Sequence, residues 1–119
     1  MSLGKEKEQG FDWPKPTIDE AIDASQQIGL HYGASFSKID VGEPIEPQRL
    51  NDRETAQKLL NLADNIMDGI VDSHVKIAKV IRSLGSRIGS LGSTSTEIDL
   101  AAFRVSHAIL QKQKTFQKT

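Results

Sequence analysis

The strongest constraint on the fold is an apolar repeat that begins after residue 51 and is not interrupted by proline. Apolar side chains recur at alternating spacings of four and three residues, the heptad spacing of helices that pack along one seam. Asn51 and Glu54 have the spacing of a helix cap at its start. The repeat therefore predicts one long helix over residues 52–84. Its predicted seam comprises Leu60, Ala63, Met67, Ile70, His74, Ile77, Ile81, Leu84 and Ile88.

Residues 85–93 are rich in glycine and serine, although Ile88 and Leu91 continue the heptad repeat. The favoured interpretation is a helix end followed by a turn, because glycine and serine disfavour helix. The alternative is a helix that continues to residue 91, in which Gly85 and Gly89 let a neighbouring backbone approach closely. The glycine spacing matches neither of the common phosphate-binding motifs, so no nucleotide site is predicted.

The N-terminal segment of residues 1–16 is predicted to be a tail. It is mostly polar and contains two prolines, which disfavour regular structure. Phe11 and Trp13 are aromatic anchors through which the tail could dock on the domain, and a flexible tail is the alternative.

A first helix is predicted over residues 17–33, because Thr17 and Glu20 have capping-box spacing and apolar residues then recur on one face. Residues 34–50 contain two prolines and show no sustained periodicity, so they predict a connection. A brief extended stretch is expected within it, around residues 36–41.

The last predicted helix covers residues 96–115, and Thr94 and Glu97 have capping-box spacing at its start. It is apolar on two nearly opposite sides, so it needs neighbours on both. Because three helices of one chain rarely supply both, this pattern indicates association with another chain. The second apolar face comprises Leu100, Phe103, His107 and Leu110.

A chain of 119 residues is long enough for one domain, which we place at residues 17–119. One Trp, one Tyr and four Phe leave the core to aliphatic side chains, and the absence of cysteine excludes disulfides and thiolate metal sites. No segment has the ~20 apolar residues that span a bilayer, and the N-terminus lacks the apolar run of a secretory signal. We therefore expect a cytoplasmic protein with no membrane partner.

Together these elements predict an all-α fold, a three-helix chain whose long heptad-patterned central helix forms a helical hairpin with the last helix. The central helix would be about 50 Å long, whereas a domain of this size has a radius of gyration of about 13 to 14 Å. An apolar stripe would then project into solvent. We therefore expect an oligomeric bundle of four or more helices, with a homodimer favoured and a heterologous protein partner as the alternative.

Few residues suggest chemistry. Asp64, Asp68 and Asp72 recur every four residues and are weak candidates for a Mg²⁺ site, although a solvated, ion-paired surface is the favoured interpretation. His74 lies in the apolar seam, where a hydrogen-bonded core histidine is favoured over a pH-sensitive one. The chain lacks a catalytic combination of residues and the histidine spacing of zinc or di-iron sites. No metal, cofactor or enzymatic activity is predicted.

The predicted function is non-enzymatic oligomerisation or adaptor binding through protein–protein association. One alternative is an oligomeric regulator that contacts nucleic-acid phosphates, although a net charge of -1 and a pI near 6.3 argue against a nucleic-acid partner. The other is a small Mg²⁺-dependent helical enzyme that acts on a phosphorylated metabolite through the three aspartates. The basic strip of the nucleic-acid alternative comprises Lys76, Lys79, Arg82 and Arg87.

Overall fold

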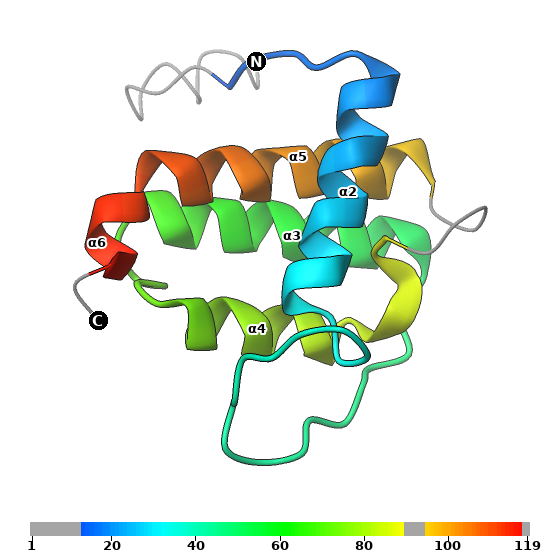
Figure 1. The fold of residues 1–119 in the computed structure, drawn as a ribbon. Coiled ribbons are helices and arrows are strands. Elements are labelled where there is room, and N and C mark those ends of the chain that lie inside the picture. The colour runs from blue at the N-terminus through cyan, green and yellow to red at the C-terminus, as the bar shows by residue number, and fades with distance from the viewer. Residues whose placement is uncertain (1–12, 90–94, 118–119) are drawn as a thin grey trace.

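The computed structural model describes residues 13–89 and 95–117, and within them the chain is helical, with no strand (Figure 1). This confirms the predicted all-α class. None of the described helices is long and apolar enough to cross a membrane. The helices are α2 (Ile18–Tyr32), α3 (Asp52–Met67), α4 (His74–Ser83), the short 3₁₀ helix η1 (Gly85–Arg87), α5 (Thr96–Gln111) and α6 (Gln113–Gln117).

Reciprocal side-chain caps fix the starts of α2 and α3. The backbone N–H of Glu20 donates to Thr17 Oγ1 at 3.2 Å, and the N–H of Thr17 donates to Glu20 Oε1 at 2.8 Å. Asn51 and Glu54 exchange the same two bonds at 2.8 and 3.1 Å. Each pair satisfies N–H groups that have no partner inside the helix. Both predicted starts are confirmed.

The prediction of a single helix over residues 52–84 is wrong, because a turn divides this segment into α3 and α4. Gly69 adopts φ 81°, a left-handed conformation that ends α3. Ser73 then caps α4, its Oγ accepting a hydrogen bond from the N–H of Lys76 at 3.3 Å. The apolar repeat conceals the turn, since Ile70 and His74 keep the heptad spacing across it.

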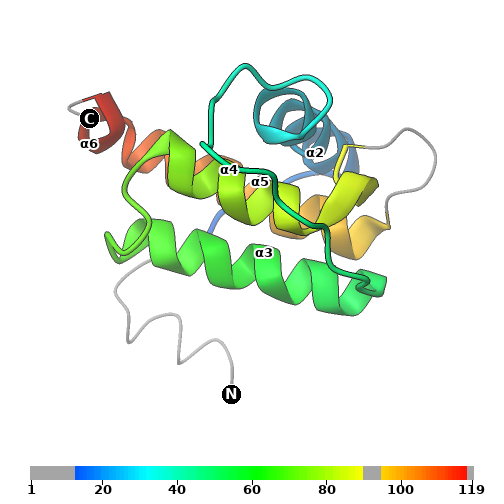
Figure 2. The ribbon, with the colours of Figure 1, turned by 90° about the horizontal axis from the view of Figure 1, so that it is seen from below.

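The helices pack in a different arrangement from the predicted hairpin. α3 and α5 lie side by side and run in the same direction, α4 runs back in the opposite direction, and α2 crosses them (Figures 1 and 2). The radius of gyration is 13.6 Å, so no described helix projects far beyond the rest. The projecting apolar stripe that predicted an oligomer is therefore absent from residues 13–89 and 95–117.

The core is aliphatic, as predicted, and the predicted seam is mostly covered by the chain itself. The largest fully buried apolar side chains are Leu59, Leu62, Ile66, Ile77, Ile81, Leu84, Ile98 and Val105. In the predicted seam, Ala63, Ile77, Ile81, Leu84 and Ile88 are buried, Leu60, Met67 and His74 are half-buried, and Ile70 is exposed in the turn.

The predicted helix over residues 96–115 corresponds to α5 followed by α6, which are separated at Lys112. Ser95 caps α5, because its Oγ accepts a hydrogen bond from the N–H of Ile98 at 3.2 Å. The predicted cap at Thr94 lies outside the described residues. One-residue differences at a helix start are common where two hydroxyl residues adjoin.

The second apolar face of α5 is partly covered by the segment that precedes α2. The Trp13 ring lies 5.8 Å from the His107 ring in an edge-to-face contact, and Phe103 stacks on His107 at 6.4 Å. Trp13 of the predicted tail is therefore docked on the domain. Residues 1–12 of the tail lie outside the described part. Leu100 and Leu110 of the same face remain exposed.

The backbone of α2 approaches closely where the helix crosses the turn after η1. A Cβ on Gly29 would lie 2.7 Å from the carbonyl oxygen of Ile88 and 3.1 Å from Cα of Gly89. The N–H of Gly89 donates to the buried Ser25 Oγ at 3.2 Å. Over residues 85–89 the chain leaves α4 and turns, as the favoured interpretation expected, whereas residues 90–93 lie outside the described part. Gly89 also provides the close backbone approach that the alternative expected.

Gly29→Ala should destabilise the protein by about 1 to 3 kcal/mol, because overpacking against a backbone carbonyl exceeds the gain in helix propensity of about 0.5 to 1 kcal/mol. Urea unfolding followed by circular dichroism measures the change. Gln27→Ala, on the exposed side of α2, is the control and should alter the free energy of unfolding by less than about 0.5 kcal/mol. A stabilised Gly29→Ala variant would contradict the close approach.

Candidate functional site

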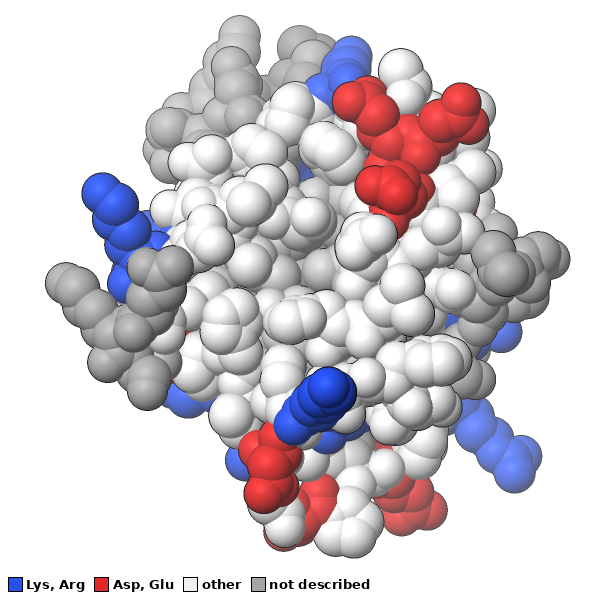
Figure 3. All heavy atoms as spheres, viewed as in Figure 1, with Lys and Arg blue, Asp and Glu red and all other residues white. Residues whose placement is uncertain are grey.

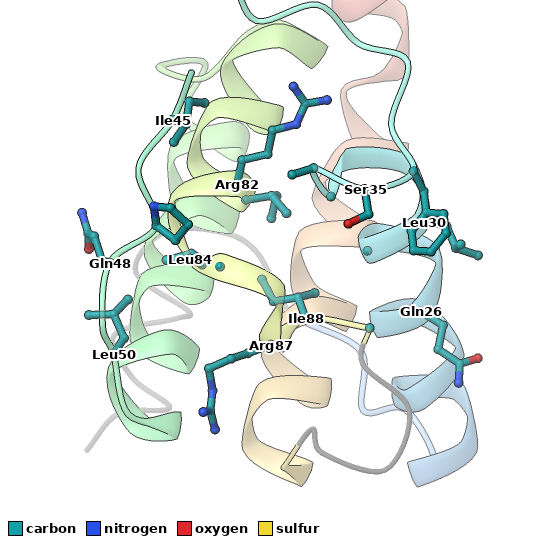
Figure 4. A pocket seen from close by; sticks show the side chains of 18 of the residues that line it. Gln26, Leu30, Ser35, Ile45, Gln48, Leu50, Arg82, Leu84, Arg87 and Ile88 are labelled. Carbon is teal, nitrogen blue, oxygen red and sulfur yellow. The ribbon is translucent and has the colours of Figure 1, made fainter. Parts of the chain in front are cut away.

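A groove opens beside the loop of residues 33–50, which connects α2 to α3. Its volume is about 890 Å³. α2 forms one wall, the loop forms the other, and the end of α4 with η1 forms the floor (Figure 4). The loop is tied to α4 by the N–H of Gln48, which donates to the carbonyl of Ser83 at 2.8 Å. The volume is within the range of sites that bind ligands.

The middle of the groove is apolar. Leu84 and Ile88 lie between Leu30 of α2 and Leu50 of the loop (Figure 4). Leu30 is 51% exposed, and Phe36, which also lines the groove, is 70% exposed. Large apolar side chains that stay exposed beside a concave surface are typical of binding sites.

Arg82 lies at one end of the groove and connects its two walls by hydrogen bonds (Figure 4). Its Nε–H donates to the carbonyl of Tyr32 at the end of α2 at 3.1 Å, and its Nη2 donates to the carbonyl of Ile39 in the loop at 2.9 Å. The side chain is half-buried, and these partners are neutral. They therefore orient the guanidinium without neutralising its charge.

Arg87 lies at the other end of the groove (Figure 4). Its guanidinium forms an ion pair with Asp52 at the start of α3. Its Nε is buried and has no hydrogen-bond partner among the described residues. Arg49 also lines the groove and is exposed. Arginine therefore supplies positive charge at several points around an apolar surface.

A second feature, an aromatic cluster, joins the end of α2 to the start of α4. The Tyr32 hydroxyl lies 2.6 Å from His74 Nδ1, and the His31 and Phe116 rings contact the His74 ring at 5.9 and 5.1 Å. Burial raises the pKa of Tyr32, so the protonated hydroxyl can donate to a neutral imidazole. Burial, with a smaller effect of His31, lowers the pKa of His74. His74 is therefore hydrogen-bonded, as the favoured interpretation expected, but its side chain is half-buried and is not part of the core.

The three aspartates proposed for Mg²⁺ do not form a metal site in the structure. The turn after Gly69 removes the continuous helix on which their four-residue spacing depended. Asp68 ends α3, and Asp72 pairs with Lys76 at 2.8 Å, which lowers the pKa of that carboxyl. No group of three metal-ligating side chains occurs in the described part of the chain.

The predicted basic strip is largely engaged in intramolecular contacts. Lys76 pairs with Asp72, Arg82 binds backbone carbonyls and Arg87 pairs with Asp52. On the face drawn in Figure 3, Lys and Arg side chains are scattered, most of them near the edge and some in the lower middle, and form no continuous strip. These contacts weaken the nucleic-acid alternative.

The groove itself was missed by sequence reasoning, which identified residues 34–50 only as a connection. Its walls come from segments that are distant in the sequence. The available signal was a run that contains two prolines together with apolar residues such as Phe36 and Ile45. Comparisons of the chain with family models, with curated proteins and with solved structures find no match.

His74 should make the protein less stable in mild acid. Because its pKa in the folded state is held below the ordinary value of 6.5, the unfolded chain binds the proton more readily, and the free energy of unfolding falls as pH drops below that value. Urea unfolding at about pH 7.5 and about pH 5.5 measures this loss.

His74→Gln retains an acceptor for Tyr32 and should reduce the loss of stability in acid. His107→Gln, on α5, is the matched control and should keep it. If both variants lose stability in acid as steeply as the unmodified protein, His74 does not cause the pH dependence.

Arg82→Ala should loosen the loop of residues 33–50, because it removes two charge-assisted hydrogen bonds of about 1.5 to 3 kcal/mol each. Tryptic cleavage after the exposed Lys38 should become at least about tenfold faster in folded protein. Lys79→Ala removes a charge from the same helix and should leave this rate unchanged. Equal cleavage rates in the two variants would show that the loop is held by other contacts.

Proposed function

We propose that this chain is a non-enzymatic protein-association module that binds a segment of a partner protein in the groove beside residues 33–50. The observation that carries the proposal is the open apolar groove, with Leu30 and Phe36 exposed at its edge. A soluble domain keeps such side chains in water at a cost in free energy, which a bound partner would remove.

The way the groove is built also supports a binding role. Arg82 ties the end of α2 to the loop, and Gln48 ties the loop to α4. Both walls are therefore fixed before a partner arrives, and a preorganised site loses less conformational entropy on binding. An adaptor needs such a site and needs no catalytic group.

Self-association is the second candidate, and a different surface favours it. Ile70 in the turn after α3 and Leu110 near the end of α5 are 63% and 64% exposed. Since α3 and α5 run in the same direction, their C-terminal ends lie at the same end of the molecule (Figures 1 and 2). A second copy that packs there would form the homodimer expected from the sequence.

Site-specific photo-crosslinking separates the two candidates. A benzophenone amino acid at Phe36 should form adducts with another protein in an extract of the source cells, whereas the same group at Leu110 should not. The Phe36 adducts should disappear in Leu30→Asp, which places a carboxylate in the apolar groove. Leu110→Asp is the matched control and should retain them.

Adducts of twice the chain's mass at Leu110, together with a dimer in light scattering, would instead establish self-association. If Phe36 forms no adduct that Leu30→Asp removes, and Leu110 forms no adduct of twice the chain's mass, the association function is wrong. Leu30 and Leu110 are both well exposed, so each variant is expected to fold, which circular dichroism can verify.

A further inference from the structure

We propose that the segment bound in the groove is acidic and amphipathic, with carboxylates flanking apolar side chains. The inference rests on the proposed association function and specifies the chemistry of the partner. Among the described residues that line the groove, Arg49, Arg82 and Arg87 are charged, and none is Asp, Glu or Lys. Asp52 pairs with one of the three arginines, so the groove keeps an excess of positive charge.

Arg82 is the group best suited to receive a carboxylate. It uses two of its five N–H donors on the carbonyls of Tyr32 and Ile39, and the others remain available. It is half-buried, which strengthens its attraction to an anion relative to a fully hydrated arginine. Because its orientation is already fixed, little side-chain entropy is lost when a carboxylate binds.

The order of groups along the groove determines the order of groups in the partner. Arg82 and Arg87 lie at opposite ends, with Leu84 and Ile88 between them (Figure 4). A complementary segment would place apolar side chains on the floor, beside Leu30, and acidic side chains toward the ends. Basic segments would be repelled, and a nucleic acid would leave the apolar floor uncovered.

Short labelled peptides test the proposal directly. One peptide carries Leu and Phe at helical spacing in its middle and Glu at both ends, and its counterpart carries Lys at the ends instead. We expect fluorescence anisotropy to show at least about tenfold tighter binding of the acidic peptide at low salt, with the advantage reduced at physiological salt. Leu30→Asp should abolish binding.

Two charge reversals examine the role of arginine without disturbing the fold. Arg49→Glu changes an exposed residue that lines the groove, and it should weaken the acidic peptide about threefold to tenfold. Lys79→Glu changes an exposed residue outside the groove by the same charge and should have no more than a small effect. Equal effects of the two reversals would mean that the peptide responds only to the net charge of the protein, which would overturn the proposal.

Other outcomes identify which inference fails. If both peptides bind equally and Leu30→Asp abolishes both, the groove binds protein segments without charge selection, and only the acidic proposal is overturned. The acidic proposal is also overturned if neither peptide binds while a photo-crosslinker at Phe36 still forms adducts with a partner. Tighter binding of dodecanoate than of the acidic peptide would assign the groove to an acyl chain, and displacement of the peptide by unlabelled protein would assign it to a second copy.

Discussion

The close approach of two backbones at Gly29 and Gly89 is the contact on which the rest of the structure depends. A side chain on Gly29 would meet the carbonyl of Ile88, so α2 can lie against this turn only because hydrogen occupies that position. At this distance Ser25 accepts a hydrogen bond from Gly89 and also bonds to Asp99 on α5. Burial raises the pKa of Asp99, and the bond to Ser25 offsets part of that rise. The crossing therefore fixes α2 against both the turn and α5.

The crossing also places the end of α2 where two groups of α4 can hold it. The Tyr32 hydroxyl bonds to His74 at the start of α4, and the Tyr32 carbonyl accepts from Arg82 near the end of the same helix. One residue of α2 is thus attached at two points about two turns apart along α4. Because the loop of residues 33–50 begins directly after Tyr32, both walls of the groove take their position from these bonds.

Local signals in the sequence predicted the starts of α2 and α3, whereas the features that the sequence did not reveal depend on contacts between distant residues. Thr17 and Glu20 form a cap within four residues, so their spacing was sufficient. Gly69 and Ser73 have the residue types of a helix stop and a helix cap, but Ile70 and His74 keep the heptad spacing intact across them. Two helices joined by a turn in the same register therefore give the same pattern as one helix. The parallel course of α3 and α5 follows from that turn. The groove depends on hydrogen bonds from Arg82 to backbone carbonyls. Every residue has a backbone carbonyl, so the sequence does not indicate these partners.

Two features of the groove are costly in the absence of a partner, and both bear on its role. A half-buried guanidinium whose partners are neutral carbonyls retains its charge in a partly desolvated position. Phe36 stays 70% exposed beside an apolar floor that a folded-in side chain could cover. Replacing Arg82 by an apolar side chain and covering the floor with others would remove both costs, since well-packed apolar replacements of buried charges are commonly neutral or stabilising. A partner that brings carboxylates to Arg82 and apolar side chains to the floor would remove the same two costs on binding, which is why the groove supports an association function better than a purely structural one.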